Sequence, residues 1–300
     1  GSDINPLSVL LVRPRLDPPP LAAIARALAA LPEAGGAPPP DGLGAFFHAS
    51  TLSTLGALRS HLLEHAPIGE PAPDPVLDWI RMVAINRLTG HSPGFFSVYT
   101  LPPNQAVSVE AQRKINEARG QVPPPRDVKA LILRKSRALL KDGAPPEHPP
   151  ARLITADSTA TPGIENASVA LVVTSPPFLD IVDYADDNWL RCWFAGIDVG
   201  AVAIARHRTE AAWEAMVRAT LSELARVVRP GGHVAFEVGE VRNGRVLLER
   251  LVWSAAEGLP FERLAVMVNR QDFTKTANCW GVSNNTKGTN TNRIVLLCRH

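Results

Sequence analysis

The sequence predicts an α/β fold with a doubly wound sheet and a mostly helical insertion. From residue 151 onward, short apolar runs alternate with amphipathic stretches of helical period, which is typical of a sheet covered by helices. Between residues 17 and 148 helical patterns dominate, and connectors rich in Pro and Gly separate them. We therefore expect a discontinuous sheet domain, residues 1–16 and 149–300, and a helical, Pro-rich insertion over residues 17–148.

The helical elements are expected in order along the first half of the chain. Residues 3–8 read as the end of a strand, a turn at Asn5-Pro6 and the start of a helix. The apolar run 8–12 is expected to be stopped by Pro14 and the run Pro18-Pro19-Pro20. Apolar residues at helical spacing then predict five further helices. They cover residues 21–32, 46–66, 76–88, 109–119 and 126–141.

The strands follow in the second half. They are expected over residues 152–155, 168–173, 233–238, 263–268 and 293–298, with helices over 209–228 and 245–257. Residues 168–173 are apolar throughout, so we expect this strand to be buried on both faces of the sheet. Arg229-Pro230-Gly231-Gly232 reads as a turn that closes the helix before it, and a polar loop, 270–292, joins the last two strands.

Composition limits the class of protein. The 300 residues suit one large domain or two modest ones, and a net charge of +2 does not by itself indicate a nucleic-acid-binding protein. Three cysteines, none in a Cys-x-x-Cys pair, argue against a disulfide framework and against a metal site. No apolar run reaches the ~20 residues that cross a bilayer. We expect a cytoplasmic protein of bacterial type, associated with the nucleoid and not with a membrane.

Positive charge is concentrated between residues 111 and 141, which contain nine Lys and Arg residues and only two acidic ones. A solvated helix face is one interpretation. The other is a surface that contacts DNA phosphates, because Lys and Arg neutralise backbone charge without reading sequence. The loop before the last strand adds Asn and Lys residues that could reach a groove. The candidate DNA-binding residues are Arg113, Lys114, Arg134, Lys135, Asn278 and Lys287.

The strand at 168–173 runs directly into Thr174-Ser175-Pro176-Pro177-Phe178. In open α/β sheets, ligands bind outside the carboxyl ends of the strands. The prolines have fixed φ angles and no N–H, so the turn presents rigid carbonyl acceptors. Ser175 adds an oxygen that can accept a proton, and Phe178 adds a flat face for stacking. Together these groups suit a planar base that bears an amino group, whereas a lone Pro-Pro is more often only a turn.

Such a turn can activate an exocyclic amine, which is a weak nucleophile because its lone pair is delocalised into the ring. Hydrogen bonds from the amine to the Ser175 hydroxyl and to the carbonyl between the prolines would localise that lone pair for attack on a methyl sulfonium. The base must first leave the duplex, and Phe178 can hold it once it is flipped. Attack at cytosine C5 would need a nucleophilic thiolate, and none of the three cysteines lies in a suitable loop.

Ser175-Pro176-Pro177-Phe178 resembles the catalytic motif of amino-methylating DNA methyltransferases, in the serine form typical of enzymes that act on cytosine N4. Asp3-Ile4-Asn5-Pro6 is similar to the family's second motif, where an acidic residue receives the ribose hydroxyls of S-adenosylmethionine. Asp157-Ser158 falls where the family contacts the cofactor adenine. The stretch Leu224–Val238 resembles the helix and strand that follow the catalytic motif. Roughly residues 1–15 and 150–300 share the resemblance.

The resemblance implies a class I, Rossmann-like methyltransferase fold, S-adenosylmethionine as cofactor and double-stranded DNA with a flipped cytosine as substrate. The catalytic residues would be Ser175, Pro176, Pro177 and Phe178. The cofactor-binding residues would be Asp3, Asn5, Pro6, Asp157, Ser158 and Thr174.

The sequence departs from the family at one point, because the first strand and its glycine-rich motif, expected before Asp3, are missing. We therefore expect a fragment, a split protein, or a second chain that completes the cofactor site. Three other functions stay open: an adenine N6 methyltransferase, a non-catalytic DNA-binding subunit that needs a partner, and, with less support, an RNA or protein methyltransferase.

Overall fold

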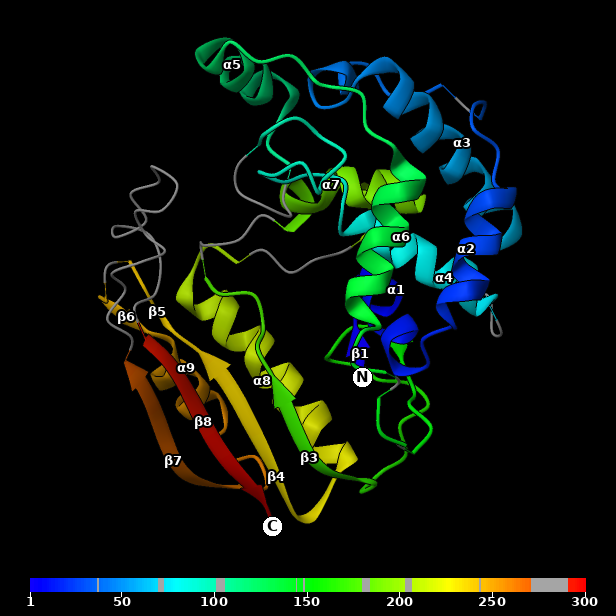
Figure 1. Cartoon of the computed structure of the whole chain (residues 1–300). Coiled ribbons are helices and arrows are strands. Elements are labelled where there is room, and N and C mark those ends of the chain that lie inside the picture. Colours follow the sequence, from blue (N-terminus) through cyan, green and yellow to red (C-terminus); the bar gives the residue numbers. More distant parts are fainter. Residues whose placement is uncertain are drawn as a thin grey trace. The chain divides into compact units, whose positions relative to one another are not determined.

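Two compact units make up the computed structural model of this chain (Figure 1). The helical unit contains Gly1, Asp3–Thr155 and Tyr184–Val202, and the sheet unit contains Ser2, Ala156–Asp183 and Ala203–His300. Each unit has its own hydrophobic core. The structure describes residues 1–36, 38–69, 73–100, 106–143, 145–147, 149–179, 184–202, 207–242, 244–270 and 291–300.

The boundaries of the units differ from the expected division at residues 16 and 149. The segment after Asp3 packs with the helical unit because Leu7 and Leu10 are buried in its core. Residues 184–202 join the same unit because Leu190 and Phe194 enter that core as well. The sequence pattern shows that these residues are apolar but not which core receives them.

The helical unit contains most of the helices predicted from the sequence. Side-chain caps of Asn5, Asp74, Ser108 and Asp127 begin four of them. The helix that starts at Pro6 contains Pro14 and ends at Leu16, shortly before the proline run that begins at Pro18. The elements are β1 (Ser2–Asp3), α1 (Pro6–Leu16), α2 (Leu21–Ala30), η1 (Leu43–Ala45), α3 (Ala49–His65), α4 (Pro75–Ile85), α5 (Val109–Arg119), α6 (Val128–Leu139), β2 (Ile154–Thr155), α7 (Tyr184–Ala195) and η2 (Val199–Ala201).

A buried ion-pair cluster lies at the centre of the helical unit. Every residue of α4 from Leu77 to Ile85 is buried, including Asp78 and Arg81. Asp78 Oδ2 accepts a hydrogen bond from Arg13 Nε at 2.7 Å, and Asp78 Oδ1 lies 3.5 Å from Arg81 Nη1. Arg81 also donates to the carbonyls of Leu62 and Ala66 at the end of α3. The cluster therefore joins α1, α3 and α4.

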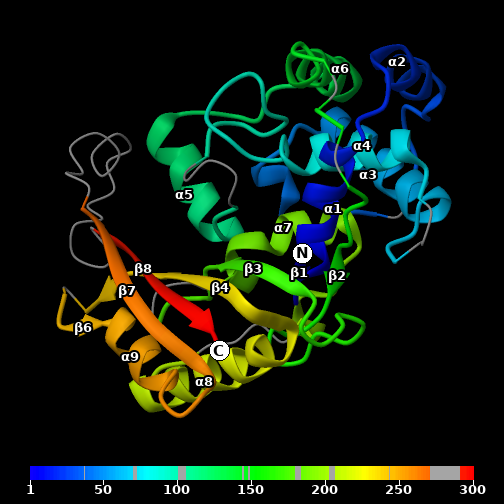
Figure 2. The same ribbon diagram turned by 90° about the horizontal axis from the view of Figure 1, so that it is seen from below.

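The sheet unit confirms the predicted α/β class. Its central sheet has the strand order β3-β4-β8-β7, with β3 and β4 parallel and the other pairs antiparallel. Helices α8 and α9 lie on one side of this sheet (Figure 2). The elements are β3 (Val169–Thr174), α8 (Glu210–Val227), β4 (Val228–Val238), β5 (Glu240–Val241), β6 (Val246–Leu247), α9 (Leu248–Ala255), β7 (Phe261–Arg270) and β8 (Thr291–Arg299).

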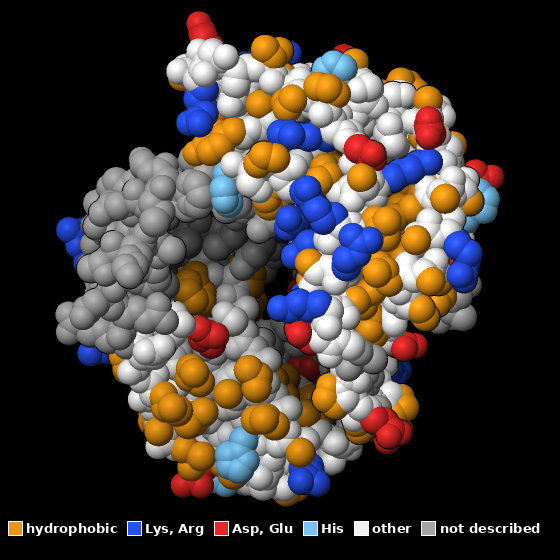
Figure 3. All heavy atoms as spheres, in the orientation of Figure 1, with side chains coloured by type: hydrophobic (Ala, Val, Ile, Leu, Met, Phe, Trp, Pro, Cys, Tyr) orange, Lys and Arg blue, Asp and Glu red, His pale blue; other side chains and the backbone are white. Residues whose placement is uncertain are grey.

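The prediction that the strand at 168–173 is buried on both faces is wrong. Leu171 is 58% exposed and Val173 is 74% exposed. Their strand, β3, lies at the edge of the sheet, and alternate side chains point away from the face that α8 and α9 cover. Figure 3 shows hydrophobic side chains gathered over β7 and β8 on a face of the molecule.

The turn predicted at Arg229–Gly232 lies inside β4 rather than before it. The register of β3 and β4 jumps from the pair Val169–Val228 to the pair Leu171–His233, so these residues form an irregularity in the strand. Gly231 has a φ of +74°, which favours glycine. A Cβ on Gly232 would approach the Ala170 carbonyl oxygen to 3.0 Å, so the second glycine lets the two strands come close.

Among the described residues, no helix combines the length and the apolar character needed to cross a bilayer.

Candidate active site

The turn that follows β3 carries the groups expected to activate an amine. Thr174 ends the strand and is paired in register with Phe236 of β4. Ser175 is exposed, and Pro176 and Pro177 are half-buried. Neither the Ser175 hydroxyl nor the Pro176 carbonyl accepts a hydrogen bond from any residue that the structure describes. Both are therefore available as acceptors for a substrate amine.

A buried indole holds this turn in place. Trp213 of α8 is 1% exposed, and its Nε1–H donates to the carbonyl of Pro177 at 2.9 Å. Pro177 and Trp213 are 36 positions apart, and no spacing rule of the sequence links them. Leu179 is fully buried in the same core, so the turn is anchored on both sides of Phe178. The sequence interpretation did not include Trp213.

Phe178 is half-buried and packs against the core of the sheet unit. We expected its ring to stack on a flipped base. These contacts anchor Phe178 to the core. Stacking of its ring on a base stays a prediction.

The loop after β2 carries Asp157 and Ser158, the candidates for cofactor binding in this unit. Asp157 Oδ1 accepts hydrogen bonds from the backbone N–H and the hydroxyl of Thr159, both at 2.8 Å. The Ser158 hydroxyl lies 3.1 Å from the Thr220 hydroxyl of α8. Asp157 is exposed, so its second carboxylate oxygen can meet a ligand.

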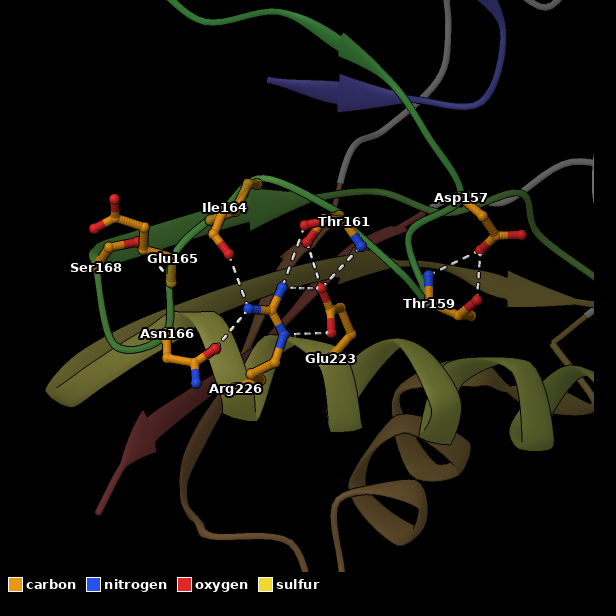
Figure 4. A network of polar contacts seen from close by, with 9 residues as sticks. All are labelled: Asp157, Thr159, Thr161, Ile164, Glu165, Asn166, Ser168, Glu223 and Arg226. Carbon is orange, nitrogen blue, oxygen red and sulfur yellow. Dashed lines mark hydrogen bonds and ion pairs between the residues drawn. The ribbon is translucent and has the colours of Figure 1, made fainter.

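An ion pair on α8 fixes the continuation of this loop (Figure 4). Glu223 accepts from the backbone N–H of Thr161 at 2.8 Å and pairs with Arg226, whose guanidinium also donates to the carbonyl of Ile164 and to the side chain of Asn166. The hydrogen bond from Arg226, supported by those from Thr161, lowers the pKa of Glu223 from its usual 4.5 to about 2. The charged carboxylate is thus part of the fold of the loop.

Replacing Glu223 with glutamine is expected to lower the free energy of unfolding of the sheet unit at neutral pH by about 2 kcal/mol. The loss is smaller than for a fully buried pair because Arg226 is partly exposed and solvent weakens its attraction to Glu223. The pKa of Glu223 is lower in the folded state, so its contribution is complete above the unfolded pKa near 4.5 and is lost as the pH falls towards 2. Urea unfolding at pH 7 and pH 3 measures this. Glu262→Gln, at an exposed position of β7, is the control and should change stability little. An equal deficit for Glu223→Gln at both pH values would contradict the pKa shift.

Asp3, Asn5 and Pro6 lie together at the start of α1 in the helical unit. Asp3 Oδ1 accepts from the backbone N–H of Asn5, and Asp3 Oδ2 accepts from the Ser8 hydroxyl, both at 2.8 Å. Asn5 caps the helix through the backbone N–H of Leu7, and Pro6 occupies its first turn. Asp3 is exposed at the end of β1. Its carboxylate oxygens therefore remain open to hydroxyl donors.

The candidate DNA-binding residues divide between two helices of the helical unit. Arg113 and Lys114 are exposed on α5, whereas Arg134 is exposed and Lys135 half-buried on α6. Part of the basic stretch is structural: Lys129 donates to the Leu31 carbonyl at 2.6 Å, and the Arg119 guanidinium lies 3.8 Å from the centre of the Tyr99 ring. Asn278 and Lys287 lie outside the described residues.

The residues from Tyr184 onward form α7, and Asp186 and Asp187 lie in its first turn, where acidic side chains favour the positive end of a helix. The same turn also borders a hollow of about 480 Å³ within the helical unit. Trp189 forms part of its wall and donates its indole N–H to the Ala106 carbonyl at 3.1 Å.

The two described cysteines lie in regular elements, Cys192 in α7 and Cys298 in β8. Cys192 is buried, and burial raises the pKa of its thiol, which disfavours the thiolate. Cys298 is half-buried in β8, and Cys279 lies outside the described residues.

No family model and no curated protein matches this chain. Among solved structures, it is similar to a protein of Thermus thermophilus that is a DNA modification methylase by name, with 22% identity over 46% of this chain and 47% of that one and a TM-score of 0.27. The complex of that protein with S-adenosyl-L-methionine gives 19% identity over 48% and 53% of the two chains, with a TM-score of 0.29.

A geranyl diphosphate C-methyltransferase from Streptomyces coelicolor A3(2) gives 12% identity over 93% and 98% of the two chains, with a TM-score of 0.30. The matches to the Thermus thermophilus protein cover only about half of that protein's length.

Proposed function

We propose that this protein is a DNA methyltransferase that transfers a methyl group from S-adenosylmethionine to the exocyclic N4 amine of a flipped cytosine. The observation that carries the proposal is the turn after β3. It presents an exposed Ser175 hydroxyl and a Pro176 carbonyl that accepts no hydrogen bond from the described residues, while Trp213 holds the neighbouring Pro177 carbonyl. Two acceptors on consecutive residues match the two N–H groups of an amine.

In this proposal the chain supplies orientation and electrostatics. The amine donates one N–H to Ser175 Oγ and the other to the Pro176 carbonyl, and its nitrogen becomes closer to tetrahedral. S-adenosylmethionine supplies the electrophilic methyl group on a sulfonium. As the new N–C bond forms and the C–S bond breaks, the nitrogen loses a proton, which the Ser175 hydroxyl can pass to solvent. No strong base is required, which agrees with the lack of a titratable side chain in the turn.

Each unit carries candidate cofactor-binding residues whose chemistry suits a part of the cofactor. The exposed carboxylates of Asp3 in the helical unit and of Asp157 in the sheet unit can each accept hydrogen bonds from donors such as ribose hydroxyls or the adenine amine. Asn5 and Pro6 fix the turn that carries Asp3, Ser158 fixes the loop that carries Asp157, and Thr174 precedes the catalytic turn.

The reaction product tests the proposal. We expect incubation with duplex DNA and S-adenosylmethionine, followed by digestion to nucleosides and mass spectrometry, to reveal N4-methylcytosine. N6-methyladenine alone would instead establish the adenine alternative, which the same acceptors would serve. Methylation of neither base, with duplex binding retained, would favour the non-catalytic DNA-binding subunit.

The exposed edge of the sheet supports a partner for this activity. Parallel strands are normally buried on both faces, yet β3 pairs on one side only among the described residues and exposes Leu171 and Val173. We propose that a further strand, from another segment or a second chain, pairs with β3 and completes the cofactor site. Calorimetry with S-adenosylmethionine tests this, because tight binding by this chain alone, with DNA present, would contradict it.

A further inference from the structure

Four cationic side chains of the helical unit come from three different segments, and Lys135 lies near enough to Arg87 and Arg15 for their charges to act on it. Arg15 lies in the last turn of α1, Arg87 follows the end of α4, and Arg134 and Lys135 are neighbours on α6. We call these four residues the cation cluster. Lys and Arg side chains are seen gathered on the same face of the molecule over α6 and α1 (Figure 3). Only Arg134 and Lys135 belong to the basic stretch that the sequence singles out.

Contacts with the loop after α4 hold part of the cation cluster in position. The Arg87 guanidinium carbon lies 4.0 Å from the centre of the Phe95 ring, and Arg87 Nε donates to the Asn86 carbonyl at 2.7 Å. Arg134 Nη2 approaches the same loop, 3.6 Å from where a Cβ on Gly94 would lie. Arg87 is half-buried and the loop is compact, so its guanidinium is ordered before any ligand arrives.

The positive charge of the cation cluster is not balanced within the described residues. None of its four side chains forms an ion pair with a described carboxylate. By contrast, Arg81 is paired with Asp78, and Arg293 with Glu240 and Glu249. Asp142 borders a hollow with Arg15, but its carboxylate lies 3.9 Å from Lys141.

The positive charges of the cation cluster repel one another at Lys135. Burial, together with the nearby charges of Arg87 and Arg15, lowers the pKa of Lys135. Like charges held this close in a partly desolvated place are unfavourable unless an anion lies among them. The three guanidinium groups and one ammonium of the cation cluster are donors that match the oxygens of a phosphate.

We propose that the cation cluster binds a backbone phosphate of the DNA substrate and so sets the position of the duplex on the helical unit. The inference rests on the proposed function for the identity of the ligand. It adds Arg15 and Arg87 to the candidate DNA-binding residues, and Arg134 and Lys135 would contact the same phosphate as these two. Such a contact carries no sequence information, and it strengthens the binding of any duplex.

The salt dependence of duplex binding tests the cation cluster. Binding of a fluorescent 20-base-pair duplex is followed by anisotropy between 50 and 300 mM KCl for the full chain and for Arg15→Gln, Arg87→Met and Lys135→Gln, roughly the range in which phosphate contacts are salt-sensitive. Each variant is expected to bind about three- to tenfold more weakly, and the slope of log K against log salt should fall by about one. Arg15→Gln changes an exposed side chain, so its result does not depend on whether the Arg87 variant folds.

Arg26→Gln is the matched control, because it removes one charge from an exposed position of α2 in the same unit. Unchanged affinity and slope for Arg15→Gln and Lys135→Gln would overturn the inference, as would a loss for Arg26→Gln equal to theirs. Equal weakening for duplex RNA and DNA would support a phosphate contact. A protein that binds DNA through the cation cluster but methylates no base would overturn the proposed function and leave this inference standing.

Discussion

Replacing Ser175 with alanine is expected to lower the rate of methyl transfer to duplex DNA by roughly 10²–10³-fold, the cost of losing one fixed hydrogen-bonding group at a reacting centre. Ser175 is exposed and has no hydrogen-bond partner among the described residues, so its loss should not disturb the fold. Duplex affinity and thermal stability should therefore stay close to those of the unchanged protein. Single-turnover transfer of a labelled methyl group measures the effect.

The same assay, applied to Trp213, distinguishes the loss of an acceptor for the amine from a misplaced turn. Trp213→Phe keeps an aromatic ring in the core but removes the N–H that holds the Pro177 carbonyl. We expect a fall of about tenfold in kcat with little change in KM, because a misplaced acceptor weakens the transition state more than substrate binding. Trp253→Phe, in α9 of the same unit, is the matched control. If the Ser175→Ala variant of the preceding prediction kept full activity, the turn would have no part in catalysis.

Replacing Asp78 with asparagine is expected to destabilise the helical unit by about 3–5 kcal/mol, the usual cost of leaving a buried charge without its partner. Asp78 and Arg81 have side-chain exposures of 3% and 1%, and Arg13 is paired with the same carboxylate. Burial already lowers the pKa of Arg81, and Asp78 is the group that opposes this effect. Urea unfolding, followed by circular dichroism, measures the change.

A surface ion pair provides the comparison for Asp78. Lys141 and Asp142 lie 3.9 Å apart with exposures of 70% and 85%, so Asp142→Asn should have almost no effect. The double variant Asp78→Asn with Arg81→Met removes both buried charges and should recover part of the lost stability. A stability for Asp78→Asn within about 1 kcal/mol of the unchanged protein would mean that water reaches Arg81, against its burial in this structure.

The sequence predicts local elements well because capping and periodicity act over a few residues. The helix expected over 109–119 is α5, bounded by the cap of Ser108 and by Gly120 in the left-handed region. The strand that leads into Ser175 is also where the pattern indicated. Its environment was not predictable, since an apolar run such as Val169–Val173 looks the same at the edge and at the centre of a sheet.

Long-range contacts account for what sequence reasoning missed in the candidate site. Trp213 meets Pro177, and Arg87 approaches Lys135, only because helices that are distant in the chain pack together. The charge density of residues 111–141 indicated a basic region, but not which of its cations hold the fold and which lie in the cation cluster. Arg119 and Lys129 hold the fold, whereas Arg134 and Lys135 join cations from other segments.

The uncovered edge of β3 also has a consequence for how the isolated protein behaves in concentrated solution. A strand whose outer edge has no partner among the described residues, and which exposes Leu171 and Val173, is a template on which a second molecule can add its own strand. Self-association through β3 would bury the same backbone groups that we assign to a completing strand. Solubility and enzymatic competence would then depend on the same few residues, and a lysine in place of Val173 would improve the first at the expense of the second.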